Sequence, residues 1–499
     1  LWEILDSFDK GRSHGRGRFA DRVFALVANR LCCPTSEHGL ARWLETDFVC
    51  DRMGRRWTPQ WRCDEERLKS SCPRVRVGGL QLSAWYRTLD MLERSKSGIE
   101  KALFLRLRTL FSLKAELVFY DLTSTYFAGR GPADLARHGH SRDGHPRDRQ
   151  VLVGLVMIDG WPVAHHVLAG NRRDSTTVPE VVEDVRKRFG IARMVFVGDR
   201  GMATISNVAL LRKDHQGYLV GLNRRRSERI YRYIESATGA WLECPVGLTA
   251  KERTMQPKTL VQEVASEEPG VRVFVVQSDD RLAYETGQRG IAMKRVKDDL
   301  EALRLRVERG KLKAPEKIGS AAGRILSRRH GDRYFAWELA NGVFRYFEHP
   351  VNLRREKAYE GKYVIQTEES GLSPVEAVGH YKELSEVERA FSRLKDVIEM
   401  RPIFHKTDSR VQAHIFVAAL AFLVDRALEK KLKAAKVDLS SREAWQALKT
   451  IRVVDFALGN GQTKRSVTRG SERLAPILRA IPIENLDPPR PPKGQETVV

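Results

Sequence analysis

Three apolar segments rich in β-branched and aromatic residues follow one another between 117 and 170. They constrain the fold of this chain more than any other feature. The segments read LVFYDLTSTYF, QVLVGLVMID and WPVAHHVLAG, and glycine and proline occur in the stretches between them. Segments of this composition, bounded by turn residues, are typical of β-strands. Since successive strands usually lie beside one another, they predict an antiparallel meander.

The chain then alternates between helical and strand patterns. A helix is expected at 176–189, the strand MVFVGD follows, a second helix begins after Gly201, and the strand GYLVGL ends at 222. Such alternation predicts parallel strands added to the meander. We therefore expect an α/β fold with a mixed sheet flanked by helices.

Changes of pattern divide the chain into five expected segments. Periodic apolar residues predict a separate helical domain before the strands, and the stretch between the strand GYLVGL and the strand GKYVIQT interrupts the order of the core. That stretch contains a charged helix at about 283–312 and the pair Asn341-Gly342, a strong hairpin signal. The segments are 1–116 (helical), 117–222 (first part of the core), 223–360 (mixed insertion), 361–435 (second part of the core) and 436–499 (C-terminal region with a disordered, proline-rich tail).

The net charge and the cysteine content indicate which partners and which cellular compartment to expect. The 499 residues carry a formal net charge of +23, which favours a polyanionic partner, and nucleic acid is the first candidate. The longest apolar run, IFVAALAFLV from Ile415, is too short to span a bilayer and is interpreted as a core helix, so no membrane partner is expected. The six cysteines lack zinc-site spacing, and we expect reduced thiols in a cytoplasmic protein.

The stretch YKELSEVERAFSRLK places Tyr381, Glu388 and Lys395 seven residues apart. On a helix this spacing puts the three side chains in one row, beside an apolar stripe that includes Val387 and Phe391. The row is either a solvated charged face or part of a functional site, and this stretch alone does not decide between them.

Two aspartates add to this row. Asp121 lies inside the first strand between large apolar neighbours, and Asp199 ends the strand MVFVGD. Each has an ordinary alternative, a satisfied buried acid for Asp121 and a turn or helix-capping residue for Asp199. With Glu388 they form an all-oxygen set that suits two Mg²⁺ or Mn²⁺ ions, which can activate a water or a 3′-hydroxyl in phosphodiester displacement.

These motifs together resemble the DDE transposases of bacterial insertion sequences. The segments FYDLTSTYF, HSRDGHPRDRQVLVGL and VFVGDRGM, with the stretch at 381–395, are similar to the group marked by a Tyr-Arg-Glu-Lys signature. The resemblance covers roughly 117–222 and 360–430, and more weakly the N-terminus. Tyr381, Glu388 and Lys395 match the signature, whereas Leu384 stands at its Arg position. The resemblance implies a ribonuclease H-like core with an insertion between the second Asp and the Glu.

The resemblance also implies an activity and its partners. Asp121, Asp199 and Glu388 would be the catalytic residues and would bind two divalent cations, Mg or Mn. The enzyme would cut the terminal inverted repeats of its insertion sequence and join the freed 3′-hydroxyl to target DNA, as a homodimer on paired ends, in the bacterial cytoplasm with the nucleoid. The alternatives are a non-catalytic DNA-binding regulator and a stand-alone nuclease on the same fold.

Several further residues are candidates for binding nucleic acid. Tyr381 and Lys395 would touch the DNA backbone by the resemblance. Arg142 lies in the loop RHGHSRDGHPRDRQ, which favours DNA contact over a metal-binding histidine cluster or a solvated loop. Arg224 and Arg225 open the insertion and either contact phosphates or form a solvated charge run. Trp337 would stack on a base by analogy with related transposases, or pack within its hairpin.

Overall fold

The computed structural model describes all residues except 10–17, 58–59, 63–74, 78–81, 112–115, 223–226, 246–257, 458–462, 469, 482, 484–485 and 488–499. The chain forms two compact units. We call residues Leu1–Ala192 and Ser385–Val499 unit 1, and residues Arg193–Leu384 unit 2. Helix α12 (Pro374–Asp396) contains the boundary between them. The five segments expected from the sequence are a finer division, which this grouping does not test, and the proline-rich tail from 488 lies outside the described residues.

Unit 1 contains the expected N-terminal helices, the three-stranded meander and the C-terminal region. Its helices are α1 (Trp2–Ser7), α2 (Arg18–Cys32), α3 (Glu37–Thr46), α4 (Leu82–Phe111), η2 (Asp174–Thr176), α5 (Val178–Phe189), α13 (Asp408–Ala434), α14 (Ser441–Leu448) and α15 (Leu474–Ala480). Its strands are β1 (Gln60–Arg62), β2 (Val75–Val77), β3 (Leu117–Tyr126), β4 (Gln150–Ile158), β5 (Trp161–Ala169), β14 (Val453–Ala457) and β15 (Thr463–Val467).

Strands β3, β4 and β5 form the predicted antiparallel meander, in the order β5-β4-β3. All nine residues of β4 are buried, as expected for the middle strand of a covered sheet. Asp159 and Gly160 connect β4 to β5 with φ angles of 50° and 69°. This left-handed backbone at both central residues is typical of the tight turns that match the twist of a hairpin.

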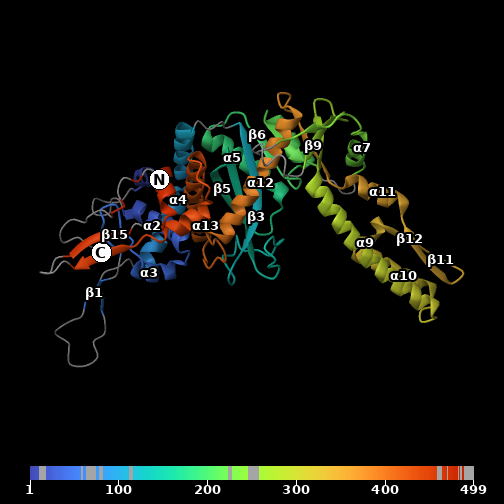
Figure 1. Cartoon of the computed structure of the whole chain (residues 1–499), viewed down its shortest axis with the longest axis horizontal. Helices are drawn as coiled ribbons and strands as arrows, with labels where there is room; N and C mark the ends of the chain where they lie inside the picture. Colours follow the sequence, from blue (N-terminus) through green and yellow to red (C-terminus); the bar gives the residue numbers. More distant parts are fainter. Residues whose placement is uncertain are drawn as a thin grey trace. The chain divides into compact units, whose positions relative to one another are not determined.

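Helix α13 is the central helix of unit 1. It packs against α2, α4 and β5, and Figure 1 shows α4 and α13 side by side. By length and composition alone it could cross a membrane, but 67% of its most apolar window is buried inside the structure. Burial of the apolar side chains in protein removes them from water as effectively as a membrane would. The interpretation of this segment as a core helix is confirmed.

A buried polar network joins α4, α5 and β5 beneath this helix. Glu100 of α4 contacts Nδ1 of His165 on β5 at 2.8 Å and also pairs with Arg188 of α5. Lys96 donates to the carbonyl oxygen of His165 at 2.7 Å. Burial, reinforced by the charge of Lys96, lowers the pKa of His165 to about 4. The imidazole is therefore neutral at pH 7.

Unit 2 contains the rest of the sheet and the expected insertion. Its helices, besides the first part of α12, are α6 (Ile205–Lys213), α7 (Glu228–Ser236), α9 (Asp279–Glu308), α10 (Pro315–Arg328), η3 (Gly331–Arg333) and α11 (Pro350–Tyr359). Its strands are β6 (Val195–Gly198), β7 (Gly217–Gly221), β8 (Leu242–Glu243), β9 (Thr259–Val264), β10 (Arg272–Ser278), β11 (Phe335–Ala340), β12 (Val343–Glu348) and β13 (Lys362–Thr367).

The strands of unit 2 pair in the order β6-β7-β13-β10-β9-β8, with β11 and β12 apart as a hairpin. Strands β6 and β7 are parallel, as predicted, and the other pairs are antiparallel, so the sheet is mixed and flanked by helices. Residues 227–360 divide into two parts. Strands β8 to β10 extend the sheet, whereas α9, α10 and the β11–β12 hairpin share a separate apolar cluster. Asn341 and Gly342 form the predicted turn, with φ angles of 53° and 78°.

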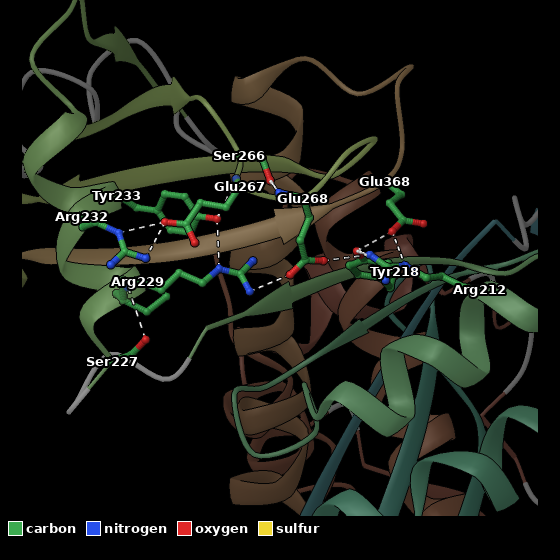
Figure 2. A network of polar contacts seen from close by, with 11 residues as sticks. Arg212, Tyr218, Ser227, Arg229, Arg232, Tyr233, Ser266, Glu267, Glu268 and Glu368 are labelled. Atoms are coloured by element: carbon green, nitrogen blue, oxygen red, sulfur yellow. Dashed lines mark hydrogen bonds and ion pairs between the residues drawn. The ribbon is translucent and has the colours of Figure 1, made fainter.

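A network of ion pairs connects α6 and β7 to α7 and to the connection between β9 and β10 (Figure 2). Tyr218 of β7 donates to Glu368 at 3.0 Å, and Arg212 of α6 contacts both Glu368 and Glu268. Glu268 also accepts from Arg229 of α7 at 2.6 Å. These contacts cross the expected boundary at 222–223, and they explain why the two sides of that boundary form one compact unit.

The neutral state of His165 makes the stability of unit 1 sensitive to acid. Its pKa is about 4 in the folded chain against an ordinary 6.5, so the unfolded state binds more protons between these pH values and stability falls as pH falls. The gap corresponds to about 3 kcal/mol at most. We expect the free energy of unfolding, measured in urea at pH 7 and 4.5, to fall less in His165→Gln than in the wild type. Equal losses in the two proteins would contradict this assignment.

Candidate active site

Asp121 lies in the middle of β3, on the face opposite Tyr120. It is half-buried, and its Oδ1 accepts the backbone N–H of Leu122 at 2.7 Å. Tyr120 is fully buried and donates to Oγ1 of Thr177 at 3.1 Å. Because successive side chains of a strand alternate between faces, β3 presents Tyr120 to one layer and the carboxylate of Asp121 to the other.

Glu388 lies on the part of α12 that belongs to unit 1. Its neighbours Val387, Ala390 and Phe391 are buried, whereas Glu388 itself is exposed. Within the described part of the chain, it makes no ion pair and no side-chain hydrogen bond. The helix therefore holds this carboxylate at the surface with both oxygens available to a cation.

Lys395, further along the same helix, is paired with a buried aspartate. Its Nζ donates to Oδ1 of Asp143 at 2.6 Å, and Nη1 of Arg401 lies 2.9 Å from the same oxygen. Burial lowers the pKa of Lys395, and the charge of Asp143 opposes that effect. Asp143 thus holds two cations together at the end of α12. The sequence analysis missed it, although it lies in the quoted segment HSRDGHPRDRQVLVGL.

The loop that contains Asp143 is held at further points. Arg142 donates its backbone N–H to Oγ of Ser124 at 2.9 Å and its guanidinium to both oxygens of Asp174, at 2.7 and 2.6 Å. The ring of His145 stacks on Tyr126 with centroids 4.0 Å apart. The guanidinium of Arg142 therefore already has a carboxylate partner, and its predicted DNA contact would be made in competition with Asp174.

In unit 2, Asp199 and Tyr381 lie near one another at the end of β6. Asp199 is exposed, and its Oδ1 accepts the backbone N–H of Arg200. Burial, followed by the charge of Asp199, raises the pKa of Tyr381 to about 12. A Cβ atom at Gly221 of β7 would lie 2.2 Å from the hydroxyl of Tyr381, so glycine there leaves room for the phenol. Tyr381 is consequently a protonated hydrogen-bond donor beside Asp199.

The structure shows the surroundings of Leu384, which stands where the Tyr-Arg-Glu-Lys signature has arginine. Leu384 is buried, 7% exposed, on the apolar face of α12, where a charged side chain would be costly unless it were paired. Arg393, which could have replaced the missing arginine, forms a two-pronged ion pair with Asp425 of α13. Arg389 is paired with Glu386 at 2.5 Å on the same helix. Neither arginine is an unpaired substitute.

The remaining predicted DNA contacts lie in the insertion. Trp337 of β11 is half-buried, and its ring stacks on Phe344 of β12 with centroids 5.8 Å apart. Its ring edge would lie 3.2 Å from a Cβ atom at Gly319 of α10. These contacts are those of a packing residue, and base stacking stays a prediction. Arg224 and Arg225 lie outside the described residues.

The expected metal ligands are therefore distributed over both units. Asp121 and Glu388 belong to unit 1 and Asp199 to unit 2, and that they share one pair of cations stays a prediction. Their chemistry fits hard divalent ions, because all three are carboxylates and both Glu388 and Asp199 are exposed. Within the described residues a different group, Glu37, His405 and His414, has side-chain atoms close enough to hold a metal ion.

Comparison with known proteins identifies a family. Residues 124–424 match the family described as transposase DDE domain, a range that includes Asp199 and Glu388 and begins just after Asp121. No curated protein matches the chain. Among solved structures, the chain is similar to a piggyBac transposase in a synaptic complex with hairpin DNA. That similarity has 9% identity and a TM-score of 0.34, over 90% of this chain and 75% of the other.

Removing the carboxylate of Asp143 should destabilise unit 1. Its side chain is 4% exposed, and Asp143→Ala would leave Lys395 without its carboxylate partner and beside Arg401, which would keep only its contact with Asp396 at 2.6 Å. Breaking a buried ion pair in this way costs about 3–5 kcal/mol. Asp174→Ala is the matched control, because its pair with Arg142 is more exposed and should contribute about 1 kcal/mol or less. Equal losses in denaturant titrations of the two variants would contradict the role of Asp143.

Proposed function

The chain belongs to the transposase DDE domain family, and from this premise we propose that it is a DNA transposase that cuts the ends of an insertion sequence and joins the freed 3′-hydroxyl to target DNA. The observation that carries the proposal is the family match over 124–424, together with Asp121, Asp199 and Glu388, to which the resemblance assigns catalysis. The parallel β6–β7 pair beside antiparallel strands supports a ribonuclease H-like core, and the position of 223–360 supports an insertion between Asp199 and Glu388.

Asp121, Asp199 and Glu388 would hold two divalent cations, Mg or Mn. Such ions, when bound, lower the pKa of an attacking water or 3′-hydroxyl and stabilise the leaving oxygen. The exposure of Glu388 and Asp199, with no ion pair to either from the described residues, supports this role. A carboxylate already neutralised by Lys or Arg would bind a cation more weakly.

The basic and phenolic groups would position DNA. Tyr381 keeps its proton at neutral pH and can donate a hydrogen bond to a phosphate oxygen without adding negative charge beside Asp199. Lys395 and Arg401 both pair with Asp143, and Arg401 also pairs with Asp396 at 2.6 Å, so the two cations are matched by two carboxylates and a phosphate would compete with these for them. The Asp143 contacts would keep both cations at the end of α12 before DNA arrives, which reduces the entropy lost on binding.

DNA, as terminal inverted repeats and as target, would be the partner, with a homodimer bringing two ends together in the bacterial cytoplasm near the nucleoid. The net charge of +23 supports a polyanionic partner. A regulator that only binds DNA and a stand-alone nuclease are the competing assignments. The first would bind without cutting, and the second would cut without joining ends to a target.

Replacing Glu388 by Gln separates catalysis from binding. The change keeps the shape of the side chain and removes the charge that would hold a cation, so cleavage of end-bearing DNA with Mg²⁺ or Mn²⁺ should fall by about 100-fold or more. DNA affinity should change little, because Lys and Arg hold the phosphates. Glu383→Gln, an exposed residue of the same helix, is the control and should retain activity. A fully active Glu388→Gln variant, or a wild type that neither cuts nor joins its own ends, would refute the assignment.

The salt dependence of binding tests the nature of the DNA contacts. Each phosphate neutralised releases condensed counterions, so log K should fall linearly with log salt, with a slope of about −0.9 for each contact on duplex DNA. We expect a loss of about a thousandfold or more in affinity between 50 and 200 mM salt, as for proteins that make roughly six or more phosphate contacts. An affinity independent of salt, measured by fluorescence anisotropy, would exclude phosphate contacts as the main source of binding.

A further inference from the structure

A second group of possible metal ligands lies in unit 1, apart from the carboxylates assigned to catalysis. Glu37 is the first residue of α3, His405 lies in the connection before α13, and His414 lies on α13. All three side chains are buried, with at most 8% exposed. We call these three residues the Glu–His–His group. Side chains of these types are rarely buried together unless each has a partner or a shared ion.

The spacing of the group is close to that of a tetrahedral metal site. Oε1 of Glu37 lies 3.4 Å from Nε2 of His405 and 3.9 Å from Nδ1 of His414. All three ligand atoms lie within 4.8 Å of one another. With ligand bonds of about 2.0–2.2 Å, two ligands of a tetrahedral zinc ion lie roughly 3.3 Å apart. The first separation already fits, and the others need only small side-chain rotations.

The orientation of His414 is an independent observation that points to a ligand. Its Nε2 lies 3.0 Å from the carbonyl oxygen of Met400, a partner to which only a protonated Nε2 can donate. Nδ1 lies 3.2 Å from Nη2 of Arg30, which can only donate, so Nδ1 is the unprotonated nitrogen, and it lies 3.9 Å from Oε1 of Glu37. A backbone acceptor that fixes the tautomer in this way is the usual second partner of a metal-bound histidine.

Arg30 of α2 occupies part of the same space. Its Nη2 lies 3.2 Å from Nδ1 of His414, and its Nη1 donates to the carbonyl oxygen of Glu399 at 3.2 Å. The guanidinium thus supplies the positive charge that the carboxylate of Glu37 needs when no ion is bound. A cavity of about 100 Å³ borders Arg30 and the Glu–His–His group. It has room for the displaced guanidinium, or for a water molecule as the fourth ligand.

We propose that the Glu–His–His group binds one zinc-class divalent ion in exchange for Arg30, and that this ion ties α3 to α13. The ligand set separates this ion from the catalytic pair. Two imidazole nitrogens and one carboxylate favour zinc, whereas an all-carboxylate set favours Mg²⁺ or Mn²⁺. Since the ligands come from elements distant in sequence, the bound ion stabilises the folded state alone. The proposal does not depend on transposase activity.

Metal content and stability of the full-length protein test the site directly. After incubation with Zn²⁺ and gel filtration, elemental analysis should find one zinc ion per chain, and Zn²⁺ should raise the Tm by about 3 °C or more. Co²⁺ should give the visible absorption of a tetrahedral ion. His405→Asn should abolish all three signals, whereas His38→Ala should retain them, since His38 lines the adjoining cavity outside the group. A wild type without bound metal, or equal loss in both variants, would overturn the proposal.

Arg30→Gln provides a test that does not depend on losing a signal. Removing the guanidinium removes both the competitor for Nδ1 of His414 and the positive charge that repels the ion. The affinity for Zn²⁺, measured by competition with a chromophoric chelator, should therefore rise about tenfold or more. The reason is that the charge-assisted contact between Arg30 and His414 stabilises only the metal-free protein, and the variant lacks it. An unchanged or lower affinity would overturn the exchange. If Arg30→Gln bound zinc and the wild type did not, the proposal would also be overturned, because the natural chain would then hold a hydrogen-bonded network without metal.

Discussion

The burial of helix α13 is the constraint on which the rest of unit 1 depends. Most residues in the middle of the helix are buried, so a polar side chain there must find a partner in a neighbouring element. Asp425, 2% exposed, accepts from Arg393 of α12 at 2.8 Å and from Trp445 of α14 at 2.9 Å. Arg410 pairs with Asp90 of α4 at 3.1 Å. The polar groups of one apolar helix thereby position the helices around it, including the segment of α12 that carries Glu388.

The same need for partners decides which charges near the predicted catalytic residues are available. Lys395 and Arg142 each form an ion pair with a carboxylate, so either side chain would have to exchange that partner for a DNA phosphate. Glu388 and Asp199 are exposed, without ion pairs to the described residues. Under the proposed function, divalent ions would bind at these open acidic groups, and phosphates would be bound by the surplus charge of many residues rather than by a single one.

In unit 2, part of the expected insertion at 223–360 belongs to the same sheet as the strands on either side of it in the sequence. Strands β8 to β10 continue the order begun by β6, β7 and β13, so the expected insertion supplies three of the six strands in this order. The network around Glu268 and Glu368 joins the two sides of the expected boundary (Figure 2). Helices α9 and α10 and the β11–β12 hairpin share an apolar cluster that, among the described residues, contains no strand of the sheet. These elements are the part of the insertion that resembles a separate module.

Short-range sequence patterns were sufficient to predict the main secondary-structure elements and the family. Alternation of apolar residues, the Asn341-Gly342 turn and the seven-residue row on α12 depend on backbone geometry within a few residues. The structure confirms the meander, the hairpin and the helix that carries this row as secondary structure. The order of the acidic motifs led to the transposase family that the comparison then established. Such features could be predicted because the side-chain periods of helices and strands are fixed.

The partners of the charged residues could not be predicted in this way. Asp143 meets Lys395 across 252 positions of the chain, and Glu37 meets His405 and His414 only because α3 packs near the start of α13. Leu384 is buried because the neighbouring turns of α12 face the core. Electrostatic pairing acts over a few ångströms in space and carries no periodic signal along the chain, so the sequence by itself determined which elements form and which family the chain joins. Only the tertiary structure decided which charges are paired, which are left open, and which residues form a possible metal site apart from the predicted catalytic carboxylates.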